Sequence, residues 1–85
     1  MKSFKYTITD AIGIHARPAG LLVNTAKQFE SEILVEANGK KGNAKGIMGV
    51  MSLGAKQGTE ITVTVNGADE EAAAGALEEF LKNNL

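Results

Sequence analysis

Every second residue is apolar in two stretches of the chain, Lys2 to Thr9 and Glu60 to Val65. Successive side chains of a strand point to opposite faces, so this period of two predicts strands with one apolar face. Ser31 to Ala37 predicts a further strand. The next two residues, Asn38-Gly39, suit the two positive φ angles of a tight hairpin, and we expect Lys40 to Asn43 to be the returning strand.

Apolar residues recur at helical spacing in the other stretches. Ala16 to Phe29 predicts a helix with Pro18 in its opening turn, where a fixed φ and a missing N–H are tolerated. Ile47 to Leu53 lies between two glycines and predicts a helix of no more than two turns. We expect Asp69 to cap a last helix. The expected buried positions of the two long helices are Ala19, Leu22, Val23, Ala26, Phe29, Ala73, Leu77, Phe80 and Leu81.

The first turn of the last predicted helix carries Glu70 and Glu71, and acidic side chains are favourable beside the positive end of a helix. The predicted order is therefore βαββαβα, with every strand apolar on one side only. Helices packed on one face of a sheet satisfy that pattern. The predicted class is α+β, an open-faced sandwich of a four-stranded, mostly antiparallel sheet with three helices on one face. A chain of 85 residues has room for one core, so we expect residues 1–85 to be a single domain.

Composition and charge narrow the possible functions. Nine Lys and Arg against ten Asp and Glu give a net charge of −1, which favours neither nucleic acid nor an anionic membrane as a partner. Without cysteine, and with one histidine, the chain has no disulfide and is a poor candidate for a metal site, and we expect no cofactor. It shows no signal peptide and no run of 18 apolar residues, so we expect a cytoplasmic protein.

The single histidine, His15, lies in the sequence GIHARPA at residues 13–19, directly before the predicted helix start. A helix N-terminus presents free N–H groups and a positive dipole end, which favour bound phosphate. A neutral imidazole nitrogen is nucleophilic near pH 7, and Arg17 can present a donor fork to phosphate oxygens. From these residues alone another interpretation stays open, in which His15 is a partly buried ring at a loop-to-helix junction.

The sequence GIHARPA closely resembles the active-site motif of HPr, the histidine-containing phosphocarrier family of the bacterial phosphoenolpyruvate-dependent sugar phosphotransferase system. The resemblance continues through NGKK at 38–41 and IMGVMSLGA at 47–55, and it covers nearly the whole chain. It implies that His15 accepts a phosphoryl group from enzyme I as a pros-phosphohistidine and passes it to sugar-specific IIA components. It also implies that Arg17 steadies the phosphoryl group, that Pro18 shapes the helix start, and that the chain is a carrier rather than a stand-alone enzyme.

The resemblance further implies a surface on which both partner proteins dock. Its residues are Ala16, Gly20, Ile47, Met48 and Met51. We expect Met48 and Met51 to be partly exposed, because a short helix with so many apolar residues cannot turn all of them inward. A carrier that presents one small site to successive partners works best as a monomer, so we expect a monomer.

At residue 46 the chain departs from the family pattern. Gram-positive HPr proteins, which the IMGVMSLG segment resembles most, carry a regulatory serine just before the short helix, and this chain has Gly46. Glycine is an acceptable N-cap but has no hydroxyl to phosphorylate. We therefore expect no regulatory serine at this position.

Two other classes of function stay open. The first is an interaction protein of the same fold that regulates transcription or metabolism without carrying phosphate, and it would not need His15 or Arg17. The second is a small-ligand sensor domain, which more often occurs beside an effector domain. The segment from Gly46 to Gly49 also fits the GxxG loop of an RNA-binding KH domain, but the near-neutral charge argues against RNA.

Overall fold

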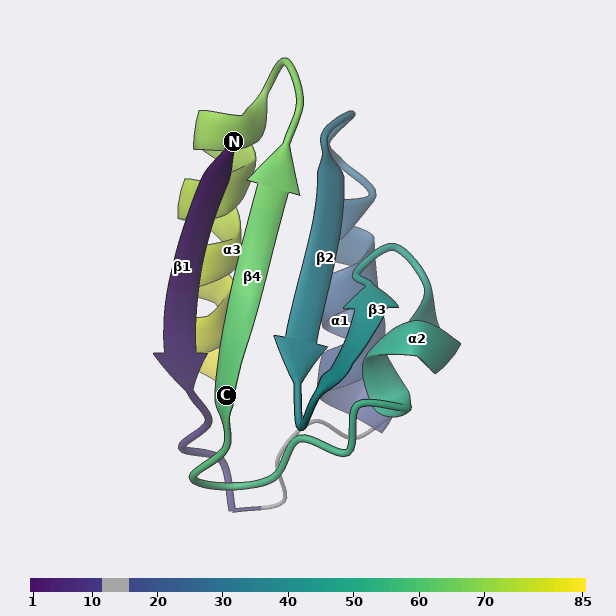
Figure 1. The fold of residues 1–85 in the computed structure, drawn as a ribbon, viewed down its shortest axis with the longest axis vertical. Helices are drawn as coiled ribbons and strands as arrows, with labels where there is room; N and C mark the ends of the chain where they lie inside the picture. The colour runs from purple at the N-terminus through teal and green to yellow at the C-terminus, as the bar shows by residue number, and fades with distance from the viewer. Residues whose placement is uncertain (12–15) are drawn as a thin grey trace.

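The computed structural model describes residues 1–11 and 16–85. Within these residues the chain forms seven elements, in the order β1 (Lys2–Thr7), α1 (Ala16–Ala26), β2 (Glu32–Ala37), β3 (Lys40–Asn43), α2 (Ile47–Met51), β4 (Glu60–Asn66) and α3 (Glu70–Asn84). Helices α1 and α3 lie behind the sheet, and α2 lies beside β3 at its edge (Figure 1). The predicted βαββαβα order and the open-faced sandwich are confirmed.

The four described strands form one antiparallel sheet in the order β1-β4-β2-β3. Its register places Phe4, Val63 and Val35 in one row across the three neighbouring strands β1, β4 and β2. The adjacent row contains Lys5 and Thr62, whose side chains face away from the helices because successive side chains alternate. The alternation found in the sequence therefore gives the sheet one apolar and one polar face.

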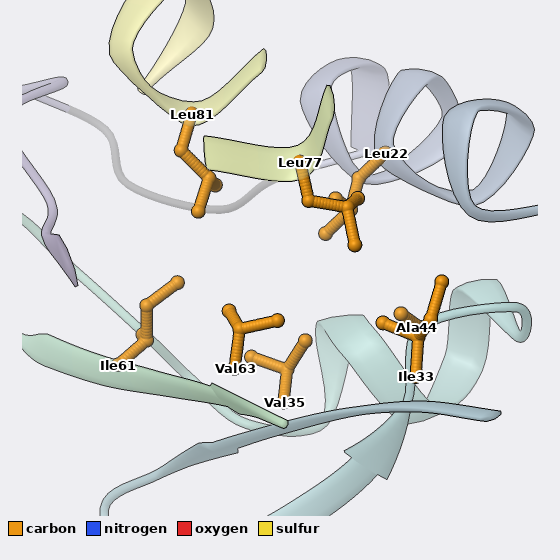
Figure 2. A pocket seen from close by; sticks show the side chains of 8 residues that line it. All are labelled: Leu22, Ile33, Val35, Ala44, Ile61, Val63, Leu77 and Leu81. Carbon is orange, nitrogen blue, oxygen red and sulfur yellow. The ribbon is translucent and has the colours of Figure 1, made fainter. Parts of the chain in front are cut away.

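The hydrophobic core lies between the sheet and the two long helices. Leucine side chains from α1 and α3 point toward the apolar side chains of the sheet, and the space between them has no room for a water molecule (Figure 2). The residues around this space are Leu22, Ile33, Val35, Ala44, Ile61, Val63, Leu77 and Leu81. This packing holds α1 and α3 against the sheet.

Helix α1 ends three residues earlier than predicted, at Ala26 instead of Phe29. The amide of Lys27 still donates to the carbonyl oxygen of Val23 at 2.9 Å, but the amides of Gln28 and Phe29 bond only three residues back, each at 3.2 Å. The last turn is therefore narrower than an α-helical turn, and the chain turns toward β2 directly after it. Phe29 nevertheless packs against the core, as its place in the apolar pattern predicted.

The predicted N-cap of α3, Asp69, is confirmed in position, but its side chain does not bind the helix that it precedes. Its carboxylate accepts hydrogen bonds from the backbone N–H groups of Glu30 and Ser31, both at 2.9 Å, and from the Ser31 hydroxyl. The segment between α1 and β2 therefore offers three donors, and the carboxylate binds these instead of its own helix. The predicted acidic first turn, Glu70 and Glu71, is confirmed.

Candidate functional site

The predicted phosphoryl acceptor, His15, lies outside the described residues, and its exposure stays a prediction. Helix α1 begins at Ala16, the next residue, as the motif predicted. In the first turn, the Arg17 side chain is exposed and Pro18 is buried. This described turn contains no acidic residue, so nothing in it opposes the positive end of the helix dipole.

A hollow of about 250 Å³ lies beside the start of α1. The residues that line it are Asp10, Arg17, Pro18, Leu21 and Asn84. The carbonyl oxygen of Leu85 accepts hydrogen bonds from the backbone N–H groups of Thr9 and Asp10, at 2.6 and 2.8 Å, and from the Thr9 hydroxyl. These bonds hold the chain that leaves β1 against the end of α3. Three separate parts of the sequence thus line the hollow: the chain after β1, the start of α1 and the end of α3.

Four exposed apolar side chains, Leu21, Ile47, Met48 and Met51, belong to the neighbouring helices α1 and α2, and we call this group the α1–α2 apolar surface. Met48 is 78% exposed and Met51 is 41% exposed, which confirms the predicted partial exposure of both. Ile47 is 41% exposed. Single exposed apolar side chains are ordinary, but three on one five-residue helix form the kind of patch that marks an interaction site.

The two helices meet where the predicted docking residues of each helix lie. Gly20 is half-buried, and a side-chain carbon added to it would come within 4.0 Å of Ile47 Cδ1. Val50 and Leu53 are buried and belong to the core. The structure therefore brings together Gly20 and Ile47, while the position of the Ala16 side chain is outside the described part.

Leu21 was missed by the sequence analysis, although its side chain is 43% exposed on α1 and lines the hollow beside the start of this helix. A signal existed. Leu21 falls outside the apolar stripe of α1, which consists of Ala19, Leu22, Val23 and Ala26. An apolar residue outside the apolar stripe of an amphipathic helix is expected to be exposed.

Gly46 is the N-cap residue of α2, with extended backbone angles of φ −124° and ψ 121°. Its N–H donates to the carbonyl oxygen of Asn43 at 2.9 Å. The departure from the family pattern therefore lies directly at the start of α2, as the sequence predicted, and this position carries no hydroxyl group.

Neither a metal centre nor a membrane span is found in the described residues. No three His, Cys, Asp or Glu side chains within residues 1–11 and 16–85 come together in a way that suits a metal ion. In that same part of the chain, every helix is too short or too polar to cross a bilayer.

The comparison with known families supplies the context for this geometry. A family model described as the PTS HPr component phosphorylation site matches residues 2–83. The chain belongs to the HPr family of phosphocarrier proteins. Membership assigns it to the phosphotransferase system, which serves sugar transport.

Solved HPr structures share the fold over almost the whole chain. The histidine-containing phosphocarrier protein of Mycoplasma is 43% identical, with a TM-score of 0.93 over 96% of this chain and 93% of that one. HPr-C-His from Thermoanaerobacter tengcongensis is 47% identical, with a TM-score of 0.92 over 98% of this chain and 93% of that one. The resemblance read from three short motifs is therefore confirmed for the family and for the fold.

A third similar structure bears on the oligomeric state. Crh, a catabolite repression containing protein of Bacillus subtilis, is 40% identical, with a TM-score of 0.79 over 100% of this chain and 98% of that one. It forms a dimer by domain swapping. The expected monomeric state of this chain therefore stays a prediction.

Proposed function

We propose that this chain accepts a phosphoryl group on His15 from enzyme I and passes it to sugar-specific IIA components. The observation that supports this most directly is the start of α1 at Ala16, immediately after His15, with no acidic residue in the first turn. The free N–H groups and the positive end of such a helix favour a phosphoryl group on the preceding side chain.

In the proposed transfer, an imidazole nitrogen of His15 attacks the phosphorus atom as the bond from phosphorus to the donor breaks, and the donor keeps the electron pair. The same events, with the imidazole as the leaving group, pass the phosphoryl group to IIA. The exposed Arg17 guanidinium is one turn or less away along the helix and donates to the phosphate oxygens. Pro18 supports the helix start without leaving an unpaired N–H.

The α1–α2 apolar surface is the proposed docking surface for enzyme I and for IIA, together with Ala16 and Gly20. Its support is the exposure of Ile47, Met48 and Met51 beside α1. Methionine is unbranched and adapts to surfaces of different shape, which suits a carrier with two kinds of partner. We propose that the carrier works in the cytoplasm as a monomer, with no cofactor and no catalytic turnover of its own.

The substitution His15→Ala tests the proposal. After incubation with enzyme I and phosphoenolpyruvate, we expect mass spectrometry to detect one acid-labile phosphate on the original chain and none on the variant. Circular dichroism should be the same for both, because a residue before a helix start contributes little to the core. Phosphate on the variant would contradict the assignment, and no phosphate on either chain would favour the interaction-protein or sensor functions.

A further inference from the structure

Helix α2 contains only five residues, Ile47–Met51, and cannot be stable by its own hydrogen bonds. Its one buried residue is Val50. A single buried side chain anchors a helix but leaves it free to tilt and slide. The position of its exposed side chains must therefore be set by what α2 touches.

The backbone of α2 approaches the backbone of β3 closely. Gly42 is buried in β3, opposite Val35 of β2, and faces Gly49 in the middle of α2. A Cβ atom on Gly42 would lie 2.8 Å from the carbonyl carbon of Gly49 and closer still to its oxygen, which real Cβ atoms do not do. A Cβ atom on Gly49 would lie 3.3 Å from the Asn43 nitrogen. At this point no side chain separates the strand from the helix.

Space, rather than backbone conformation, requires glycine at these two positions. In the described residues positive φ angles occur at other glycines, such as Gly39 with φ 75°, and not at Gly42 or Gly49. At Gly39 an added Cβ would have open space, because apart from its chain neighbours no atom of the described residues lies within 4 Å of it. Gly39 therefore makes the hairpin turn, whereas Gly42 allows α2 to approach β3.

Hydrogen bonds from the same hairpin hold both ends of α2. Before the helix, the Asn43 side-chain oxygen accepts from the Lys45 N–H at 2.8 Å, and the Asn43 carbonyl oxygen accepts from the Gly46 N–H at 2.9 Å. After the helix, the Asn38 side-chain amide donates to the Leu53 carbonyl oxygen at 3.0 Å. The hairpin thus contacts α2 before, within and after the helix, so a change in the spacing of β3 and α2 moves the helix as a unit.

We propose that Gly42 is a positioning residue for partner docking. By lacking a side chain, it seats α2 directly on β3 and so sets Ile47, Met48 and Met51 relative to the start of α1. Gly42 itself lies behind α2 and acts through Gly49. This inference rests on the proposed function, since a partner that covers both helices requires them in one fixed relation to obtain close complementarity.

Three glycine-to-alanine substitutions test the proposal, and they differ in the space available for the new methyl group. Gly42→Ala has none, Gly49→Ala has a tight fit, and Gly75→Ala, on the exposed side of α3, has open space and is the matched control. Steady-state transfer from enzyme I gives KM and kcat for each chain as the phosphoryl acceptor. Amide NMR spectra report whether α2 has moved, and direct phosphorylation by phosphoramidate reports the reactivity of His15 without a protein partner.

We expect Gly42→Ala to raise KM about tenfold, Gly49→Ala to raise it less, and Gly75→Ala to leave it unchanged. Amide shifts should change in residues 46–54, while kcat and the phosphoramidate reaction stay close to those of the original chain. If Gly42→Ala does not fold, the same measurements on Gly49→Ala test the proposal. An unchanged KM in a folded variant whose α2 shifts have changed would overturn the inference, and so would unchanged shifts.

The proposed function fails in a different way. Suppose that the original chain takes no phosphate from enzyme I, while the amide shifts of α2 still differ between the original chain and Gly42→Ala. Gly42 would then position α2, but the proposed function and the docking role assigned to α2 would be wrong. If transfer occurs with ordinary kinetics in all four chains, the proposed function stands and the role of Gly42 in docking is wrong.

Discussion

Helices α2 and α3 use their apolar residues for different purposes. Helix α3 runs through 15 residues, and it buries Ala73, Leu77 and Leu81 against the sheet. Helix α2 runs through five residues, buries Val50, and leaves three large apolar side chains exposed. Apolar residues in α3 stabilise the fold, whereas most of those in α2 are available to a partner.

The polar contacts at the starts of the two helices differ too, because more side-chain bonds stabilise the start of α3 than the start of α2. Ahead of α3, the Asp69 carboxylate accepts three hydrogen bonds from Glu30 and Ser31, and Glu70 accepts one from the Gly67 N–H and pairs with the N-terminal ammonium. The N-cap of α2 is a glycine with no side-chain bond. Substitutions around α3 should therefore change the free energy of unfolding, and substitutions on α2 should change binding.

The largest expected effect is that of Leu77→Ala. Leu77 is 1% exposed and points into the core beside Leu22 and Val63 (Figure 2). Removing most of a buried leucine should lower the free energy of unfolding by about 2–5 kcal/mol, out of a typical total of about 5–15 kcal/mol. Urea denaturation followed by circular dichroism measures this change. A loss below about 1 kcal/mol would mean that α3 contributes less to the core than its burial indicates.

Met48→Asp should weaken partner binding and leave the stability of the fold almost unchanged. Because Met48 is 78% exposed, the free energy of unfolding should change by no more than about 0.5 kcal/mol. Affinity for both enzyme I and IIA should fall at least about tenfold, since a carboxylate would lie at an apolar contact. Calorimetric titration measures the affinities, and Met48→Leu is the control that keeps an apolar side chain. Unfolding of the Asp variant would show that Met48 belongs to the core.

Most of the fold could be predicted from patterns within short segments of the sequence. The alternation around Phe4 and around Val63 identified one-sided strands, and Asn38-Gly39 identified the hairpin, whose φ angles are 54° and 75°. These patterns could not predict contacts between residues that lie far apart in the sequence. Asp69 is the N-cap residue of α3, as the sequence predicted, but its carboxylate binds Ser31, 38 residues away.

The candidate site was predictable in a similar way, from the motif and from patterns within single helices. The motif identified the helix start at Ala16, and the surplus of apolar residues in α2 identified Met48 and Met51 as exposed. The close approach of Gly42 to Gly49 follows from how α2 lies on β3, which no pattern within either segment reveals. Assignment of phosphoryl chemistry to His15 came from the resemblance, because a lone histidine is open to more than one interpretation.

A smaller, pH-dependent effect is expected for Asp69→Asn. Hydrogen bonds from the Ser31 hydroxyl and the Glu30 N–H hold the pKa of Asp69 below its usual value. The ionised carboxylate is thus favoured by folding, and its contribution is present above the ordinary aspartate pKa of about 3.9 and is lost as the pH falls through the lowered pKa. The variant should be less stable near neutral pH and should lose less stability on acidification than the original chain.

Urea denaturation at a series of pH values measures this difference. The N-terminal ammonium and the Gly67 N–H lower the pKa of Glu70 as well. Both chains contain Glu70, so the difference between them isolates Asp69. Glu71→Gln is the control for loss of a negative charge in this turn, since within residues 1–11 and 16–85 Glu71 forms an exposed ion pair with Lys2 and no other. Parallel pH profiles for the original chain and Asp69→Asn would contradict the role given to this carboxylate.

The smallest expected effect, and the one of opposite sign, is that of Gly75→Ala. Gly75 lies within α3, and apart from the adjacent backbone of its own helix no atom of the described residues lies within 4 Å of an added Cβ. Glycine inside a helix costs about 0.5–1 kcal/mol relative to alanine, so the variant should be more stable by that amount. The urea midpoint should rise with an unchanged m value, and the affinity for enzyme I should not change. A gain in stability that also altered the affinity would show that α3 influences docking, and the division of roles between α2 and α3 would then be wrong.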